Sequence, residues 1–197
     1  MRLFTTITAA ILSLSASGQT TIDTESNYTR SNVKGVIIQN SFPKGGGYTD
    51  PTGKEFAYRI FWTRVSNETA TPLELSMKFP ADPVLIFAAP ESYLKVFLPP
   101  GTMTIEKEGL YDYGATDLKS FLATGLSKPT TLLRIINPGE SCMFYVGTLT
   151  YQPGNGVPRT GLVLQDQTLF YRISGYDTQR DPELIPCGRI IFKKSGR

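Results

Sequence analysis

The side chains with the most obvious chemistry in this sequence are two cysteines and a group of carboxylates, and no histidine accompanies them. The absence of histidine excludes Ser–His and Cys–His nucleophile pairs, a histidine general base and a mixed Cys/His zinc site. Cys142 and Cys187 are too far apart for a CxxC redox pair and too few for a structural metal. The sequence therefore contains no motif for a metal or another cofactor.

Carboxylates are the remaining candidates for acid–base catalysis. Glu106, Glu108 and Asp112 lie within the stretch IEKEGLYDYG, and two carboxylates about 5 to 10 Å apart would suit a glycosidase whose sugar is held by Tyr111 or Tyr113. The alternative is that these charges form the solvated end of a strand over residues 103–107. We favour the solvated strand end, because spacing alone does not identify groups with perturbed pKa values.

Tyrosines between the expected strands form a second candidate site. Loop aromatics stack on sugar rings and anchor protein interfaces. If they share one end of the fold, they form a binding rim; if not, they cover the edges of the core. The candidates are Tyr48, Tyr111, Tyr113, Tyr151 and Tyr176.

The amino terminus has the pattern of a secretory signal peptide, residues 1–18, cut before Gln19. Arg2 precedes a weakly apolar run over residues 7–14 and small residues over 15–18; the alternative is an ordinary buried segment. No later run is long and apolar enough to cross a membrane. We expect a secreted, periplasmic or cell-surface protein.

Export places the two cysteines in an oxidising environment, where paired thiols persist as disulfides. Cys142 begins an expected strand over residues 142–151, and Cys187 precedes one over 188–193. We expect a disulfide between these strands, worth about 3 to 4 kcal/mol. The alternative is two free, buried cysteines that act as small apolar residues.

Composition indicates one globular domain that does not bind nucleic acid. Removal of residues 1–18 takes one positive charge, which leaves 19 basic against 17 acidic residues, a net charge of +2. The basic residues are scattered, so no nucleic-acid footprint is present. Residues 19–32 are polar and lack periodicity, which predicts a flexible leader before a single domain over 33–197.

Short alternating segments separated by Pro and Gly turns dominate that domain. The clearest is LELSMKF, residues 73–79, in which every second residue is apolar. Only residues 116–126 show helical spacing, with Thr116 or Asp117 as amino cap; Trp62 lies mid-strand, as a core residue would. We predict an all-β fold, an immunoglobulin-like antiparallel β-sandwich of about 8 to 10 strands with one short helix.

Two Asn-x-Thr triplets, at Asn27 and Asn67, would accept N-glycans in a eukaryotic secreted protein, and the second marks an exposed turn. FWTRVSNETATPLELSMKFP followed later by INPGESCMFYVGTL resembles a general pattern of bacterial exported β-sandwich modules. This resemblance implies a fold and no site residues.

These observations favour an exported, non-enzymatic binding module that recognises a cell-surface glycan or an envelope protein through its end loops. Two alternatives stay open. One is a structural or assembly subunit that pairs through a sheet edge, and the other is a small carbohydrate-active hydrolase that uses a carboxylate pair.

Overall fold

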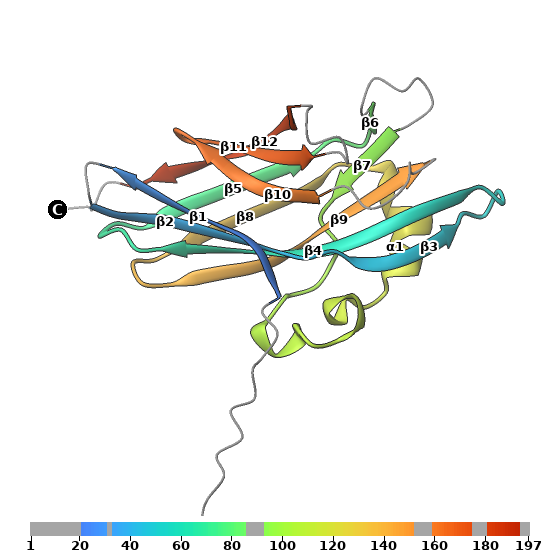
Figure 1. Cartoon of the computed structure of the whole chain (residues 1–197), viewed down its shortest axis with the longest axis horizontal. Helices are drawn as coiled ribbons and strands as arrows, with labels where there is room; N and C mark the ends of the chain where they lie inside the picture. Colours follow the sequence, from blue (N-terminus) through green and yellow to red (C-terminus); the bar gives the residue numbers. More distant parts are fainter. Residues whose placement is uncertain (1–20, 31–32, 86–92, 152–158, 175–180, 194–197) are drawn as a thin grey trace, which may run out of the picture.

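Over the residues that the structure describes, the protein is a sandwich of two antiparallel β-sheets with one short α-helix (Figure 1). The computed structural model describes residues 21–30, 33–85, 93–151, 159–174 and 181–193, so the expected signal peptide lies outside it. The predicted sandwich and its single helix are confirmed. None of the helices in these ranges is long and apolar enough to cross a membrane.

The larger sheet has seven strands in the order β1-β2-β4-β9-β7-β6, and β3 pairs with β4 beyond the end of β2. Its strands are β1 (Ile22–Arg30), β2 (Val33–Ser41), β3 (Lys44–Thr49), β4 (Glu55–Asn67), β6 (Val84–Leu85), β7 (Tyr93–Phe97) and β9 (Ser141–Tyr151). We call this layer the seven-stranded sheet.

The second layer, the five-stranded sheet, has the order β10-β11-β12-β5-β8. Its strands are β5 (Leu73–Phe79), β8 (Thr130–Ile136), β10 (Arg159–Gln165), β11 (Thr168–Ser174) and β12 (Glu183–Phe192). Between β7 and β8 the chain forms η1 (Ile105–Lys107), η2 (Tyr111–Gly114), α1 (Leu118–Thr124) and η3 (Gly125–Ser127).

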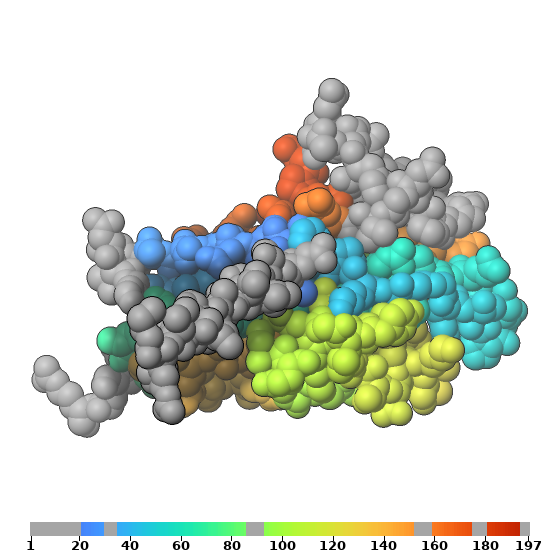
Figure 2. All heavy atoms as spheres, turned by 60° about the horizontal axis from the view of Figure 1, so that its bottom comes forward, coloured from blue at the N-terminus to red at the C-terminus, as the bar shows by residue number. Residues whose placement is uncertain are grey.

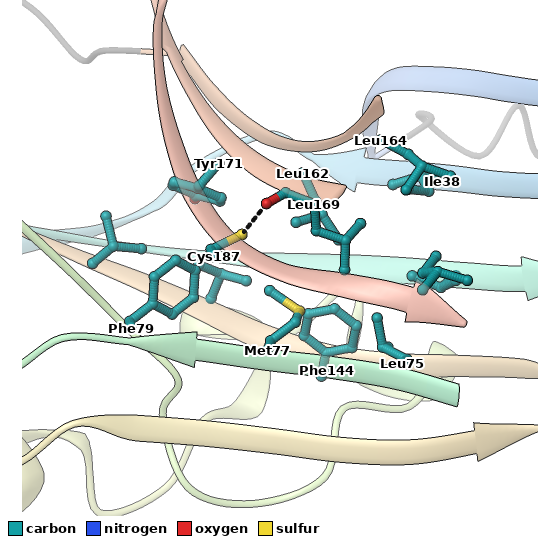
Figure 3. Close-up of a cluster of buried hydrophobic side chains, with 14 of the residues drawn as sticks. Ile38, Leu75, Met77, Phe79, Phe144, Leu162, Leu164, Leu169, Tyr171 and Cys187 are labelled. Atoms are coloured by element: carbon teal, nitrogen blue, oxygen red, sulfur yellow. Dashed lines mark hydrogen bonds between the residues drawn. The ribbon is translucent and has the colours of Figure 1, made fainter. Parts of the chain in front are cut away.

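The main core lies between the sheets (Figure 3). The alternating strand β5 behaves as its sequence predicts, because Leu73, Leu75, Met77 and Phe79 are all buried there. Each such side chain contributes about 1.5 to 3 kcal/mol through its removal from water.

A second apolar cluster covers the outer face of the seven-stranded sheet. Trp62 points to this face and is 1% exposed, as its mid-strand position predicts. It belongs to a cluster with Tyr113, Leu118 and Leu122 from the η2–α1 region. Figure 2 shows this helical segment (yellow-green) lying against the strands of the sheet. Strand β4 is therefore buried on both faces near its centre.

The polar segment that we expected to be a flexible leader forms strand β1, which pairs with β2 from Ile22 onward. Its inward-facing side chains are polar but have specific partners. Thr24 accepts a hydrogen bond from the Asn40 amide, and the Tyr28 hydroxyl accepts one from the main-chain N–H of Leu164. A strand whose core-facing residues are polar shows no hydrophobic alternation, so the pattern in the sequence does not reveal it.

Strand β3 contains three consecutive glycines, Gly45 to Gly47. Glycine allows this strand to approach β4 closely, since a Cβ atom at Gly45 would lie 2.3 Å from the main-chain oxygen of Tyr58. Residues 103–107, expected to be a strand, instead contain the 3-10 helix η1.

The predicted disulfide is wrong, because Cys142 and Cys187 are both free thiols. Cys142 lies on β9 of the seven-stranded sheet, whereas Cys187 lies on β12 of the five-stranded sheet. The Cys187 thiol donates to the main-chain oxygen of Leu169 at 3.5 Å, deep in the core (Figure 3). Cys142 lies beside Arg134 of β8, two strands away from β12.

We expect the purified protein, denatured without reductant, to contain two titratable thiols. In the native protein both should react slowly at pH 8 and faster at higher pH, because burial raises the pKa of Cys142 and raises that of Cys187 to about 12. Cys142→Ser should remove the faster phase, since Cys142 is half-buried and Cys187 is buried. Intact-mass measurement that finds a bridged chain, two hydrogens lighter, would contradict the structure.

The triplet at Asn67 does not mark an exposed acceptor. The Asn67 side chain is 1% exposed, and its amide group donates to the main-chain oxygens of Thr71 and Ile136 at 2.9 Å each. Its Oδ1 accepts from the main chain and hydroxyl of Thr69. The side chain holds the β4–β5 turn and has no free amide for a glycan, whereas Asn27 on β1 is exposed.

Candidate functional site

Four aromatic rings form a row across the outer face of the seven-stranded sheet, one from each of four adjacent strands. Tyr48 on β3 pairs with Phe56 on β4, and Tyr151 on β9 pairs with Tyr93 on β7. The two pairs meet because the ring centroids of Phe56 and Tyr151 are 5.7 Å apart. Cross-strand aromatic pairs of this kind stabilise a sheet by about 0.2 to 1 kcal/mol each. We call these four residues the aromatic row.

Lys54 lies over the aromatic row. Its Nζ is 3.5 Å from the centroid of the Tyr151 ring and 5.3 Å from that of Tyr93, so the cation faces the negative side of both rings. A hydrogen bond with Tyr93 raises the pKa of Lys54, against a smaller opposing effect of desolvation. The rings thus hold a cation contributed by the protein itself.

A hydrogen-bonded chain of polar side chains lies next to the row. The Tyr58 hydroxyl donates to Oδ2 of Asp112 at 2.7 Å, and its oxygen is 3.3 Å from the Tyr111 hydroxyl. Burial, followed by the hydrogen bond with Tyr111, raises the pKa of Tyr58 far above its usual value. Tyr58 therefore stays protonated and remains a donor to the carboxylate.

The members of this chain differ greatly in exposure. The Tyr111 side chain is 75% exposed, although its hydroxyl contacts Tyr58. Asp112 is 6% exposed, and its Oδ1 is buried without a hydrogen-bond partner among the described residues. An unpartnered buried acceptor costs about 1 to 3 kcal/mol, so this arrangement is locally unfavourable for stability.

The backbone that carries these residues is strained as well. Asp112 and Tyr113 adopt left-handed conformations with φ of 47° and 55°, and Gly114 follows with φ of 64°. A left-handed residue other than glycine costs roughly 1 kcal/mol. The surrounding contacts hold this turn: the Tyr113 hydroxyl donates to the oxygen of Phe42, and Lys44 Nζ donates to the oxygens of Glu108 and Leu110 at 2.7 Å each.

The structure separates the tyrosines that the sequence grouped together. Tyr48 and Tyr151 lie in the aromatic row, and Tyr111 lies beside it. Tyr113 is only 1% exposed and packs in the outer cluster, under Lys44 at 4.1 Å. Tyr176 lies outside the described residues.

The three carboxylates have different local surroundings. They lie on 3-10 turns and not on one face of a strand. Glu106 is exposed, Glu108 accepts a hydrogen bond from the Thr21 hydroxyl, and Asp112 accepts one from Tyr58. Among the described residues each carboxylate thus has its own separate surroundings.

Sequence reasoning missed Lys54, Phe56, Tyr58 and Tyr93 as members of this surface. Phe56 and Tyr58 share a face of β4, as their spacing of two residues indicates, but nothing in the sequence shows that β7 and β3 bring Tyr93 and Tyr48 to the same row. Strand order decides that, and the topology places β4 and β9 between them.

Comparisons of the chain with protein-family models, with curated proteins and with solved structures give no match. The site is therefore interpreted from its own geometry.

Proposed function

We propose that the protein is an exported, non-enzymatic binding module that recognises a glycan on the outer face of its seven-stranded sheet. The observation that carries this proposal is Tyr111, which is 75% exposed while its hydroxyl contacts that of Tyr58, itself hydrogen-bonded to Asp112. A ring that is both exposed and held by a hydrogen bond presents a preorganised stacking face to a ligand.

Such a surface suits the chemistry of a saccharide. The C–H face of a sugar ring stacks on an aromatic ring, and its hydroxyl groups need donors and acceptors nearby. The exposed Tyr111 hydroxyl, whose hydrogen points to the oxygen of Tyr58, provides an acceptor for a sugar hydroxyl. Because Asp112 fixes the Tyr58 hydrogen as a donor, the orientation of the Tyr111 hydroxyl is set before a ligand arrives.

The adjoining aromatic row supports the same proposal. Tyr58 is two residues from Phe56 on the same face of β4, so a ligand stacked on Tyr111 lies close to the row. Lys54 covers the face of Tyr151. We therefore assign the row as a second contact area, in which the Lys54 ammonium donates hydrogen bonds to sugar hydroxyls or pairs with the carboxylate of an acidic sugar. An envelope protein is the competing ligand.

The experiment is a glycan array probed with the purified protein, in which multivalent display compensates for a weak single site. We expect binding to a restricted set of saccharides, with dissociation constants of about 0.1 to 1 mM in solution. Absence of binding to every saccharide, together with capture of an envelope protein, would overturn the glycan proposal.

Asp112 is expected to act as a positioning residue. Asp112→Ala should weaken saccharide binding about tenfold, or ~1.4 kcal/mol, because Tyr58 and Tyr111 lose their fixed orientation. Asp112→Asn should restore binding to within about threefold, because its amide oxygen still accepts from Tyr58 and asparagine tolerates a left-handed backbone.

Asp117 offers a matched control, since it is also left-handed but exposed and makes no side-chain cap bond. Asp117→Ala should leave saccharide affinity unchanged in titration calorimetry. Equal losses for the Ala and Asn variants at position 112 would contradict a positioning role.

A further inference from the structure

The two long edges of the sandwich differ in whether side chains bind their main-chain groups. On one side, Asn40 of β2 binds both main-chain groups of Leu162 on β10, and Tyr28 accepts from Leu164, so side chains occupy the edge of β10. On the other side, β8 has a single strand neighbour, β5, within the described ranges. Next to it, β9 extends past β7, which pairs only with residues 147–151.

A groove of about 570 Å³ lies between these two open edges. Its walls combine polar surface with apolar side chains, which include Leu98, Met103, Leu132 and Met143. The groove therefore offers space for apolar side chains. It lies beside strand edges whose outward main-chain N–H and C=O groups have no neighbouring strand to pair with.

Strand β8 is unusually exposed for a strand of this composition. Leu133 and Ile135 are 61% and 48% exposed, although both are strongly apolar. An exposed apolar edge strand is a template for another extended chain.

Charge selects the occupant. Arg134 is the one charged side chain among the described residues that line the groove. It pairs in register with the buried Leu75 of β5, which places it on the inward-facing side of β8. Its guanidinium donates to the oxygen of Leu133 at 2.8 Å and to no other described residue, and none of the described carboxylates forms an ion pair with it. A strand without charge that paired with this edge would bury the arginine without a partner, which is unfavourable. A strand that carries a carboxylate would pair with the arginine instead.

We propose that this groove binds an extended peptide segment of another protein, which adds to β8 as a sixth strand of the five-stranded sheet. Apolar side chains of the peptide enter the groove, and a carboxylate of the peptide pairs with Arg134. This site is separate from the glycan surface, and it stands or falls independently of that proposal.

The probes are three acetylated, amidated heptapeptides in which threonine alternates with an inward-facing residue. Each peptide has three inward positions, of which one carries glutamate and the other two carry valine. The three peptides differ in which inward position carries the glutamate. We expect at least one to bind in titration calorimetry and to shift the amide resonances of β8. Replacing glutamate with lysine, or N-methylating the main chain on one edge, should weaken that binding at least tenfold.

The decisive variant is Arg134→Glu, which should lose the glutamate peptide at least tenfold and gain the lysine peptide to within about threefold of the original affinity. Lys78→Glu, on the outer face of the neighbouring β5, is the matched control and should change neither. Failure of all three peptides at 1 mM, or binding that ignores both the charge swap and N-methylation, would overturn the proposal. So would a dimer of the protein that blocks β8.

Discussion

Replacing Asn40 with leucine is expected to lower the free energy of unfolding by about 4 kcal/mol. The Asn40 side chain donates to the oxygen of Leu162 at 3.1 Å and accepts from its N–H at 2.9 Å, and it also accepts from the Thr63 hydroxyl at 3.0 Å. These residues are buried, so the variant leaves several polar groups without partners and without water. Thermal or denaturant unfolding measures the loss.

Gln39→Leu is the control for this prediction. Gln39 is the neighbour of Asn40 on β2, and its amide donates to the Glu25 carboxylate in an exposed contact. Exposed contacts of this kind are worth about 0.2 to 1 kcal/mol, so the control should lose little. A loss below about 1 kcal/mol for Asn40→Leu would show that the side chain does not hold the two sheets together.

Replacing Tyr111 with alanine is expected to reduce saccharide affinity by at least twentyfold, or ~1.8 kcal/mol. The variant removes the exposed stacking face and one hydroxyl at once. Stability should change by less than about 1 kcal/mol, because the ring is 75% exposed and contributes little to the core.

Two variants separate the parts of this effect. Tyr111→Phe keeps the ring but loses its contact with the Tyr58 hydroxyl, so it should lose less affinity than Tyr111→Ala. Leu110→Ala removes a neighbouring exposed apolar side chain, which is 52% exposed, and should leave affinity unchanged. Equal losses for Tyr111→Ala and Leu110→Ala would indicate a general disturbance of the loop.

Much of the fold could be predicted from residue patterns. Strand β5 alternates strictly, and its apolar residues are buried as expected; the segment with helical spacing contains α1. Those elements follow from local physics, because a period of two or of 3.6 residues places apolar side chains on one face. Strands β1 and β3 escaped prediction because their core-facing positions are polar or glycine.

Whether the cysteines pair, and which residues form the site, could not be predicted from local patterns, because both depend on the order of the strands in the sheets. Cys142 and Cys187 both lie on strands, but Cys142 lies beside β8, two strands away from β12, and only the sheet order shows that. Likewise, Tyr48, Tyr111 and Tyr151 are candidates by residue type, whereas Tyr93 joins them through strand pairing and Lys54 through the turn between β3 and β4. Tyr113 shows the limit of residue type, because a buried core position uses tyrosine as readily as a binding surface does.

The most direct test of the proposed glycan surface is an NMR titration of protein labelled at its tyrosine rings with a saccharide selected on the array. The ring resonances of Tyr111 should shift first and most, followed by those of the aromatic row, whereas Tyr171, buried between the sheets, should stay unchanged. Saturable shifts confined to residues around the β8–β9 groove, with Tyr111 unaffected, would contradict the assignment of the glycan site to the outer face of the seven-stranded sheet.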